Sequence, residues 1–239
     1  MTTQQLLSPF RRAINDYKMI QNGDKIAVGV SGGKDSLVLL TLLREYQKYF
    51  NVQFDLLAVT IDMGFCDNAF APIAEYCNSI GVEYDVVKTE IAEGVFNIRK
   101  EKNPCSLCSK MRRGALNNEI VAKGYNKLAL GHHLDDVVDT FMLSLFYEGR
   151  LNTFQPKSFM SRSGVTLIRP MIYLAEKDIS GLAKTMPVVT SSCPEDKHTE
   201  RESMKQLLAD LSKTYPDLTQ KFANAIMHPD RYNLWSVDD

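Results

Sequence analysis

The stretch VGVSGGKDSLVLL, residues 28–40, places two glycines, a lysine, an aspartate and two serines between apolar runs. The run that leads into it, KIAVGV at 25–30, is short and β-rich, as a buried strand is. Residues 36–50 follow with apolar side chains at helical spacing. The polar stretch is therefore predicted to connect a buried strand to a helix.

A glycine loop in this position suits phosphate. Glycines let the backbone come close to an anion, and the helix N-terminus presents free N–H groups and a positive dipole end. Lys34 adds charge. The predicted phosphate cradle consists of Ser31, Gly32, Gly33, Lys34, Asp35 and Ser36. Its spacing differs from GxxxxGK[ST] and from GxGxxG, and an ordinary tight turn is the alternative interpretation.

The rest of the chain alternates between strand and helix patterns. Strands are predicted at 25–30, 55–62, 83–91, 127–131 and 165–172, and helices at 36–50, 68–81, 108–125, 135–149 and 175–186. This alternation predicts an α/β fold, a parallel twisted sheet with helices on both faces. Ligands of such sheets bind beyond the carboxyl ends of the strands.

The pattern changes after Pro187, where a polar, turn-like segment precedes a charged helix at about 199–213 and a last helix after Pro216. We therefore divide the chain into a nucleotide-binding domain, 1–187, and a helical C-terminal extension, 188–239. The extension is short enough to pack with the domain as one compact body.

Composition narrows the function classes. The chain has 239 residues and a net charge of −1, so it lacks the basic bias of a nucleic-acid-binding domain. A local basic cluster comprises Arg99, Lys100, Lys102, Lys110, Arg112 and Arg113. No signal peptide is recognisable and no apolar run approaches the roughly 20 residues of a membrane span. We expect a cytoplasmic protein whose five cysteines hold metal or reactive thiols.

Cys105 and Cys108 form a CxxC that opens a predicted helix. Two thiolates at this spacing can chelate a metal or cluster. A redox pair or buried, inert cysteines are the alternatives. Cys193 lies far downstream, and three cysteines would leave one cluster position open, as a reactive cluster needs. Cys77 lies on a predicted helix and is expected in the core, and Cys66 is left without a role.

His132 and His133 follow the predicted strand at 127–131. Adjacent side chains point in different directions, so joint ligation of one metal is disfavoured. A hydrogen-bonded turn is one interpretation. Contact of one histidine with a nucleotide phosphate or a developing charge is the other.

The loop resembles the SGGxDS motif of the PP-loop ATP pyrophosphatases, which bind ATP and release pyrophosphate while they adenylate a substrate. Such chemistry needs Mg²⁺, and hence carboxylates near the phosphates. Asp35 is one candidate. Asp135 and Asp136, at the start of a predicted helix, are others, although one of them is as well explained by helix capping. Asp62, at a strand end, either faces the nucleotide or completes a turn.

Four segments in order, SGGKDS, PCSLCSKMRRG, ALGHHLDDVVDTFMLSLFYEG and IRPMIYLAEKDI, resemble the TtcA family of tRNA 2-thiocytidine synthetases. The likeness covers residues 8 to 228 and implies the adenine nucleotide alpha hydrolase-like PP-loop fold. Enzymes of the TtuA type are less similar, because their flanking zinc-binding cysteine pairs are absent here. A tRNA lysidine synthetase shares the glycine loop without needing the CxxC.

The resemblance implies ATP, Mg²⁺ and a [4Fe-4S] cluster, with adenylation of the C2 oxygen of a tRNA cytidine and its replacement by sulfur. The cluster ligands would be Cys105, Cys108 and Cys193. The resemblance also implies that Lys34, Asp35 and Asp136 take part in catalysis, and that Asp35 and Asp136 bind Mg²⁺. The further residues expected to contact the nucleotide are Asp62, Gly131 and His132. The residues expected to contact RNA are Lys110, Arg112 and Arg113.

The partners implied are tRNA and a sulfur donor, either a cysteine desulfurase or sulfide, and a homodimer is suggested by the family alone. No membrane partner is expected. Two other hypotheses stay open at this point. One is a PP-loop iron–sulfur enzyme that acts on another nucleoside or a small molecule, including desulfuration. The other is a nucleotide-binding redox sensor, which would bind ATP without turnover.

Overall fold

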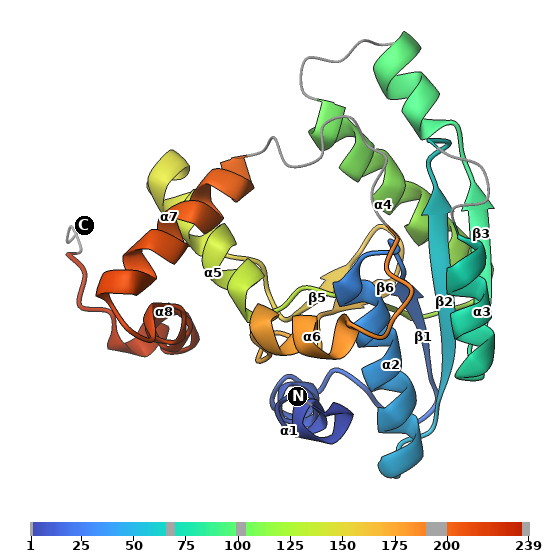
Figure 1. Ribbon diagram of the computed structural model, residues 1–239, viewed down its shortest axis with the longest axis horizontal. Helices are drawn as coiled ribbons and strands as arrows, with labels where there is room; N and C mark the ends of the chain where they lie inside the picture. Colours follow the sequence, from blue (N-terminus) through green and yellow to red (C-terminus); the bar gives the residue numbers. More distant parts are fainter. Residues whose placement is uncertain (1, 66–69, 99–103, 190–199, 236–239) are drawn as a thin grey trace. The chain divides into compact units, whose positions relative to one another are not determined.

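A six-stranded sheet forms the centre of the computed structural model, which describes residues 2–65, 70–98, 104–189 and 200–235. The strand order is β3-β2-β1-β4-β6-β5 (Figure 1). The strands are β1 (Asp24–Gly29), β2 (Phe54–Asp62), β3 (Glu83–Lys88), β4 (Lys127–Ala129), β5 (Lys157–Met160) and β6 (Val165–Ile168). All neighbouring strands are parallel except the antiparallel pair β5 and β6. The predicted α/β fold is confirmed.

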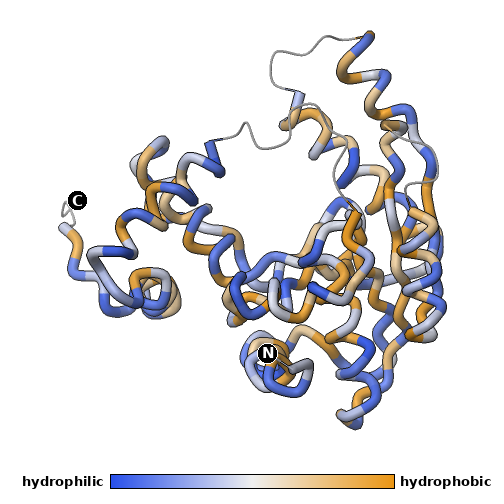
Figure 2. Tube along the Cα trace, viewed as in Figure 1, coloured by the Kyte–Doolittle hydropathy of each residue, from blue (hydrophilic) through white to orange (hydrophobic). Residues whose placement is uncertain are grey.

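Helices alternate with these strands. The α-helices are α1 (Thr3–Asp16), α2 (Lys34–Tyr49), α3 (Ala71–Ser79), α4 (Pro104–Ala122), α5 (Leu134–Leu143), α6 (Glu176–Ala183), α7 (Glu200–Thr214) and α8 (Leu218–Met227). Two π-helical turns, η1 (Glu93–Ile98) and η2 (Ser144–Glu148), and the 3₁₀ turn η3 (Pro229–Arg231) complete the list. Polar and apolar residues alternate along the helices in Figure 2, as amphipathic helices require. Among the described helices, none is both long enough and apolar enough to cross a membrane.

The chain divides into two compact units. The sheet unit comprises Met1–His133 and Gln155–Asp196, and the helical unit comprises Leu134–Phe154 and Lys197–Asp239. The sheet with α1 to α4 and α6 belongs to the first, and α5, α7 and α8 belong to the second. The structure thus groups α5 with the C-terminal helices, which the sequence-based division at residue 187 does not do.

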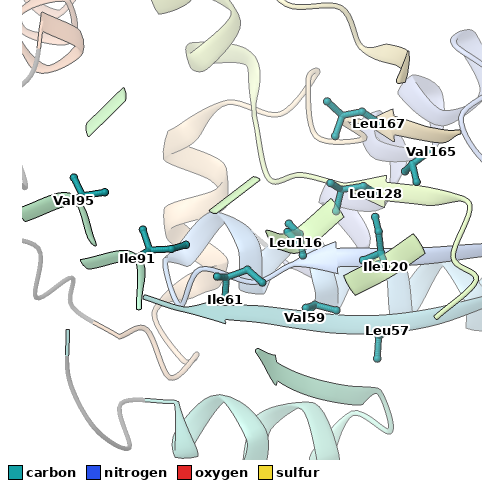
Figure 3. Packing of buried hydrophobic residues seen from close by; sticks show 11 residues of the cluster. Leu57, Val59, Ile61, Ile91, Val95, Leu116, Ile120, Leu128, Val165 and Leu167 are labelled. Atoms are coloured by element: carbon teal, nitrogen blue, oxygen red, sulfur yellow. The ribbon is translucent and has the colours of Figure 1, made fainter. Parts of the chain in front are cut away.

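Helices cover both faces of the sheet. On one face α2 packs with α1 and α6, and a 2.7 Å hydrogen bond between Thr41 and Tyr76 joins α2 to α3. On the other face α4 lies over the central strands (Figure 1). Figure 3 shows Leu116 and Ile120 of α4 against Ile61 of β2 and Leu128 of β4. The spacing of four places both α4 residues on one helix face, so α4 is held by apolar packing.

The strands differ from the prediction by one strand that was not expected and by the ends of three others. The strand expected at 83–91 ends at Lys88, and the strand expected at 127–131 ends at Ala129. The edge strand β5 was not predicted, because KSFM is short and every second residue is exposed. The strand expected at 165–172 ends at Ile168. Pro170 follows, and a proline has no N–H to continue a strand ladder.

The helix ends differ as well. The helix expected at 68–81 covers Ala71–Ser79, and the helix expected at 175–186 covers Glu176–Ala183. The helix expected at 108–125 covers Pro104–Ala122 in the structure. The helix expected at 135–149 ends at Leu143 and continues as the π turn η2. Gly149 follows with a φ of 64°, the left-handed conformation that ends helices.

A buried ion pair joins β1 to β4 at the amino end of the sheet. Lys127 Nζ lies 2.5 Å from Asp24 Oδ2 and donates to the carbonyl of Met19 at 2.7 Å. Both side chains of the pair are 8% exposed. Asn126 donates to the other carboxylate oxygen at 3.0 Å, so both oxygens of Asp24 are hydrogen-bonded. The pair therefore fixes the two strands that carry the candidate site at their opposite ends.

We expect Lys127→Met to lower the free energy of unfolding by about 3 kcal/mol, because Asp24 then stays buried without its cation. Urea unfolding followed by circular dichroism measures the loss. Lys25→Met is the matched control, since the Lys25–Asp55 pair spans 3.8 Å and its side chains are 52% and 66% exposed. A surface pair contributes at most about 1 kcal/mol. Equal losses in the two variants would contradict the assignment.

In the helical unit, acidic residues of α5 face basic residues of α7. Arg201 Nη1 lies 3.4 Å from Asp136 Oδ1, and Arg201 Nη2 donates to Thr140 Oγ1 at 3.2 Å. An apolar cluster lies beside this contact and contains Val138, Phe141, Met142, Met204 and Leu208. Asp139 is 3% exposed, and no hydrogen bond from the described residues reaches its Oδ2.

Burial raises the pKa of Asp139 to about 6, against opposing effects of Lys205 and Arg201 and with support from Asp136 and Asp135. A carboxyl whose pKa is higher folded than unfolded holds its proton longer in the folded state. Its contribution to stability is therefore lost as pH rises from about 4 to about 6.

Asp139→Asn removes this titration. We expect the stability difference between variant and wild type to grow from near zero at pH 4 to roughly 1–3 kcal/mol in favour of the variant at pH 8. Urea unfolding across this range measures it. Asp210 is the control, because hydrogen bonds from Lys213 and Gln206 lower the pKa of this exposed carboxyl, so Asp210→Asn should not stabilise the protein at pH 8. A difference for Asp139→Asn that does not change with pH would disprove the buried titration.

Candidate functional site

The loop Ser31–Ser36 connects β1 to α2 at the carboxyl edge of the sheet. Gly32 has a φ of +88°, and a Cβ there would meet Val189 at 3.2 Å and Ile73 at 3.3 Å, so only glycine fits without strain. Ser36 Oγ donates to the Gly33 carbonyl at 2.9 Å, and Gly33 N donates to Ser31 Oγ at 3.3 Å. These hydrogen bonds join residues of the same loop and stabilise its conformation.

The helix α2 begins at Lys34, directly after Gly33 at the N-cap position. A glycine has no side chain to cap the first N–H groups, so these groups point at whatever lies beyond the helix start. The connection of a buried strand to a helix is confirmed as predicted. Its role as a phosphate cradle remains a prediction that this geometry favours.

Lys34 is held between two carboxylates. Its Nζ lies 2.9 Å from Glu176 Oε1 on α6 and 3.1 Å from Asp35 Oδ1. Burial lowers the pKa of Lys34, but the hydrogen bond to Glu176 and the charge of Asp35 outweigh it, so the pKa is raised above its ordinary value. Lys34 is therefore a cation at neutral pH, and it is paired with two carboxylates.

Gly131 brings the end of β4 against this loop. A Cβ at Gly131 would lie 2.9 Å from the carbonyl carbon of Asp35, 3.0 Å from its oxygen and 3.1 Å from Ser36 N. The buried His133 places its Nε2 3.9 Å from Asp35 Oδ1. Because β4 and β2 lie on opposite sides of β1, the loop and Gly131 meet where the strand order reverses, the usual ligand site of such sheets.

His132 contacts a buried arginine. Arg169 Nε donates to His132 Nδ1 at 3.2 Å, and Arg169 Nη1 donates to the Gln155 carbonyl at 2.5 Å. Burial, with the positive charge of Arg113, lowers the pKa of Arg169 to about 10. Arg169 is therefore still a cation at neutral pH.

Sequence reasoning assigned no role to Arg169 or Glu176. Both lie in the segment IRPMIYLAEKDI, whose similarity to the family is visible in the sequence. Their partners, His132 and Lys34, are 37 and 142 residues away, so no local pattern reveals these contacts.

Asp62 and Asp136 lie in different surroundings. Asp62 Oδ1 accepts from Gly64 N at 2.9 Å, which is the turn role; contact with a nucleotide stays a prediction. Asp136 belongs to the helical unit and faces Arg201, whereas Asp35 belongs to the sheet unit. The described residues contain no group of three side chains that would hold a metal alone. Mg²⁺ in nucleotide sites takes one or two carboxylates plus phosphate oxygens, so these roles stay predictions.

The CxxC lies in the first turns of α4. Cys105 is exposed and Cys108 is half-buried, with its inner side on the apolar cluster beneath α4. Three residues apart on a helix, the two side chains share one face. Two thiolates in this arrangement suit a cluster or metal. Cys193, the predicted third ligand, lies outside the described residues.

The two remaining cysteines are Cys77 and Cys66. Cys77 is fully buried, and burial raises the pKa of its thiol to about 11, which confirms its place in the core. Cys66 lies outside the described residues. The candidate RNA contacts Lys110, Arg112 and Arg113 are all exposed on α4, whereas Arg99, Lys100 and Lys102 lie outside the described part of the chain.

A glycine loop of this shape at the switch point of a parallel sheet defines a PP-loop protein, and residues 3–208 match the PP-loop domain family. A tRNA-cytidine(32) 2-sulfurtransferase of Dichelobacter nodosus is 38% identical over 239 residues, which cover 95% of this chain and 90% of the relative. The enzyme of the same name from Tolumonas auensis is 37% identical over 227 residues, 91% and 73% of the two chains. The chain belongs to the tRNA-cytidine(32) 2-sulfurtransferase family, the TtcA family, and is a transferase.

A solved structure resembles it over almost its full length. The U34-tRNA thiolase NcsA from Methanococcus maripaludis, determined with its [4Fe-4S] cluster, matches with a TM-score of 0.77 and 25% sequence identity. The match covers 96% of this chain and 79% of that chain. The PP-loop fold expected from the sequence is confirmed.

We expect Gly131→Ala to weaken ATP binding by at least roughly tenfold, because the new methyl group would collide with the backbone of Asp35 and displace the loop. Isothermal titration calorimetry with ATP measures the dissociation constant. Gly114→Ala is the matched control, since nothing lies within 4 Å of a Cβ at that helical position. Unchanged affinity in a folded Gly131→Ala variant would show that ATP does not use this loop.

Proposed function

We propose that this protein is an ATP-dependent tRNA sulfurtransferase that adenylates the C2 oxygen of a cytidine and replaces it with sulfur. One observation carries the proposal. The SGGKDS loop meets Gly131 at the switch point of a sheet whose helix α4 presents Cys105 and Cys108. The names of the relatives and of the thiolase with a [4Fe-4S] cluster support the same chemistry.

In the first step the C2 oxygen attacks the α-phosphate of ATP. The bond from the α-phosphorus to the bridging oxygen breaks, and pyrophosphate leaves. Residues Ser31 to Ser36 would bind the pyrophosphate through their N–H groups and the first turn of α2. Lys34 would transfer its contact from Glu176 to a phosphate oxygen, and Asp35 would hold Mg²⁺ together with the phosphates.

In the second step hydrosulfide adds to C2, the bond from C2 to oxygen breaks, and AMP leaves. The proton of the hydrosulfide passes to water, so sulfur replaces oxygen without net oxidation. The exposed and half-buried thiols of α4 fit the predicted [4Fe-4S] cluster, with Cys193 as third ligand. When bound, such a cluster supplies an iron atom with an open position for sulfur.

The exposed cations of α4 would bind the tRNA backbone. Arg112 follows Cys108 by four residues and shares its side of the helix, Arg113 is its neighbour in the sequence, and Lys110 is exposed on a different side of the same helix. Binding through phosphate contacts weakens with salt in proportion to the number of contacts. A protein that acts on a small molecule would show no such salt dependence with tRNA.

Anaerobic reconstitution with iron and sulfide, followed by incubation with ATP and unmodified tRNA, tests the function. We expect 2-thiocytidine in the nucleoside mass spectrum, with one pyrophosphate released per thiolation. Cys108→Ala should abolish the thionucleoside, because one predicted cluster ligand is lost. Cys77→Ala is the matched control, since this buried cysteine lies in the core and should leave thiolation in place.

Two results would contradict the proposal. The first is a protein that carries its cluster and binds ATP but forms no thionucleoside, which favours a redox sensor if pyrophosphate is also absent. The second is full thiolation by Cys108→Ala. Retention of the cluster absorbance in Cys193→Ala would remove Cys193 from the ligand set.

A further inference from the structure

The contact between Arg169 and His132 defines the protonation state of the imidazole. A guanidinium has only donors, so the 3.2 Å bond from Arg169 Nε requires that His132 Nδ1 accept. A ring nitrogen that accepts carries no proton. The remaining proton of the neutral imidazole is then on Nε2, which is a donor.

This arrangement is the reverse of the one that makes a histidine a base. A carboxylate at Nδ1 holds a proton there and leaves Nε2 as a proton acceptor, as in hydrolase triads. A guanidinium at Nδ1 leaves Nε2 as a donor and repels a second proton on the ring. Arg169 is 8% exposed and is held on its other side by the Gln155 carbonyl, so it has little freedom to release His132.

The imidazole of His132 also lies at the carboxyl edge of the sheet, where the predicted phosphate-binding loop is. His132 directly follows Gly131, whose backbone packs on Asp35, and precedes His133, whose Nε2 is 3.9 Å from the same aspartate. His132 is therefore the neighbour in sequence of the residue that packs against the predicted phosphate-binding loop. Partly exposed, it can reach a ligand that occupies the loop.

We propose that Arg169 is a positioning residue that fixes His132 in the Nε2–H tautomer, so that His132 donates a hydrogen bond to a phosphate oxygen of the nucleotide and does not act as a general base. The nucleotide part of this inference rests on the proposed function; the tautomer does not. A purely structural Arg169, which only ties the loop at Gln155, would leave the tautomer of His132 unconstrained.

The tautomer is measured on the intact protein with ¹⁵N-labelled histidine by long-range ¹H–¹⁵N correlation. The chain has only four histidines, and the signal missing in His132→Gln assigns His132. We expect an unprotonated Nδ1 and a protonated Nε2 in the wild type, and a mixture of tautomers in Arg169→Met. Arg162→Met, at an exposed arginine, should keep the wild-type spectrum.

A proton on Nδ1 of wild-type His132 overturns the proposal, whether or not Arg169→Met folds. An unchanged tautomer in a folded Arg169→Met variant overturns it as well. Neither result depends on thiolation, so failure of the proposed function and failure of the tautomer assignment are told apart.

The donor role is tested by ATP-dependent pyrophosphate release. A glutamine at 132 keeps an N–H donor near the position of Nε2 but cannot take up a proton, whereas alanine has neither property. We expect His132→Ala to lose about 100-fold in rate, the usual effect of one missing donor to a developing charge. His132→Gln should stay within about tenfold of the wild type. Equal loss in both variants would mean that His132 accepts a proton, and would refute the donor role.

Discussion

The contact between the backbones of Gly131 and Asp35 is the constraint on which the candidate site depends. It is possible because β1 and β4 are adjacent and parallel, with Val28 opposite Ala129, so that both strands end at the same edge. A side chain at 131 would fill the space that the first turn of α2 occupies. The absence of one Cβ thus decides that the loop and the histidines after β4 lie together.

The charges around the loop explain why a nucleotide would need a cation with it. Lys34 contributes one positive charge, and Asp35 and Glu176 contribute two negative ones within 3.1 Å of its Nζ. A triphosphate that enters such a site meets net negative charge, and repulsion between partly desolvated charges is strong. A divalent cation that arrives with the phosphates would reverse this balance. This charge balance is a physical reason for the proposed use of Mg²⁺, whose ligands stay predictions.

Local pattern was sufficient for the elements and insufficient for the contacts between them. The run 25–30 and the helical spacing of 36–50 predicted β1 and α2 to within two residues at each end, because burial imposes these periods on the sequence. The strand β5 was not predicted, because an edge strand needs no continuous run of apolar residues. Asp136 was expected beside a nucleotide, and its ion pair with Arg201 was not, since the two residues are 65 positions apart.

The extent of burial distinguishes cysteines that the sequence places alike on predicted helices. Cys77 and Cys108 both lie on helices, yet Cys77 is fully enclosed and keeps its proton, whereas Cys105 and Cys108 lie on a side of α4 that solvent reaches. The same side of the helix continues into Arg112, four residues or about 6 Å further along the axis. A polyanion bound at Arg112 would hold its nearest groups within one helical turn of the thiols. The short distance between cation and thiol suits a polynucleotide, because a polynucleotide can place a backbone phosphate and a reacting base along the same helix.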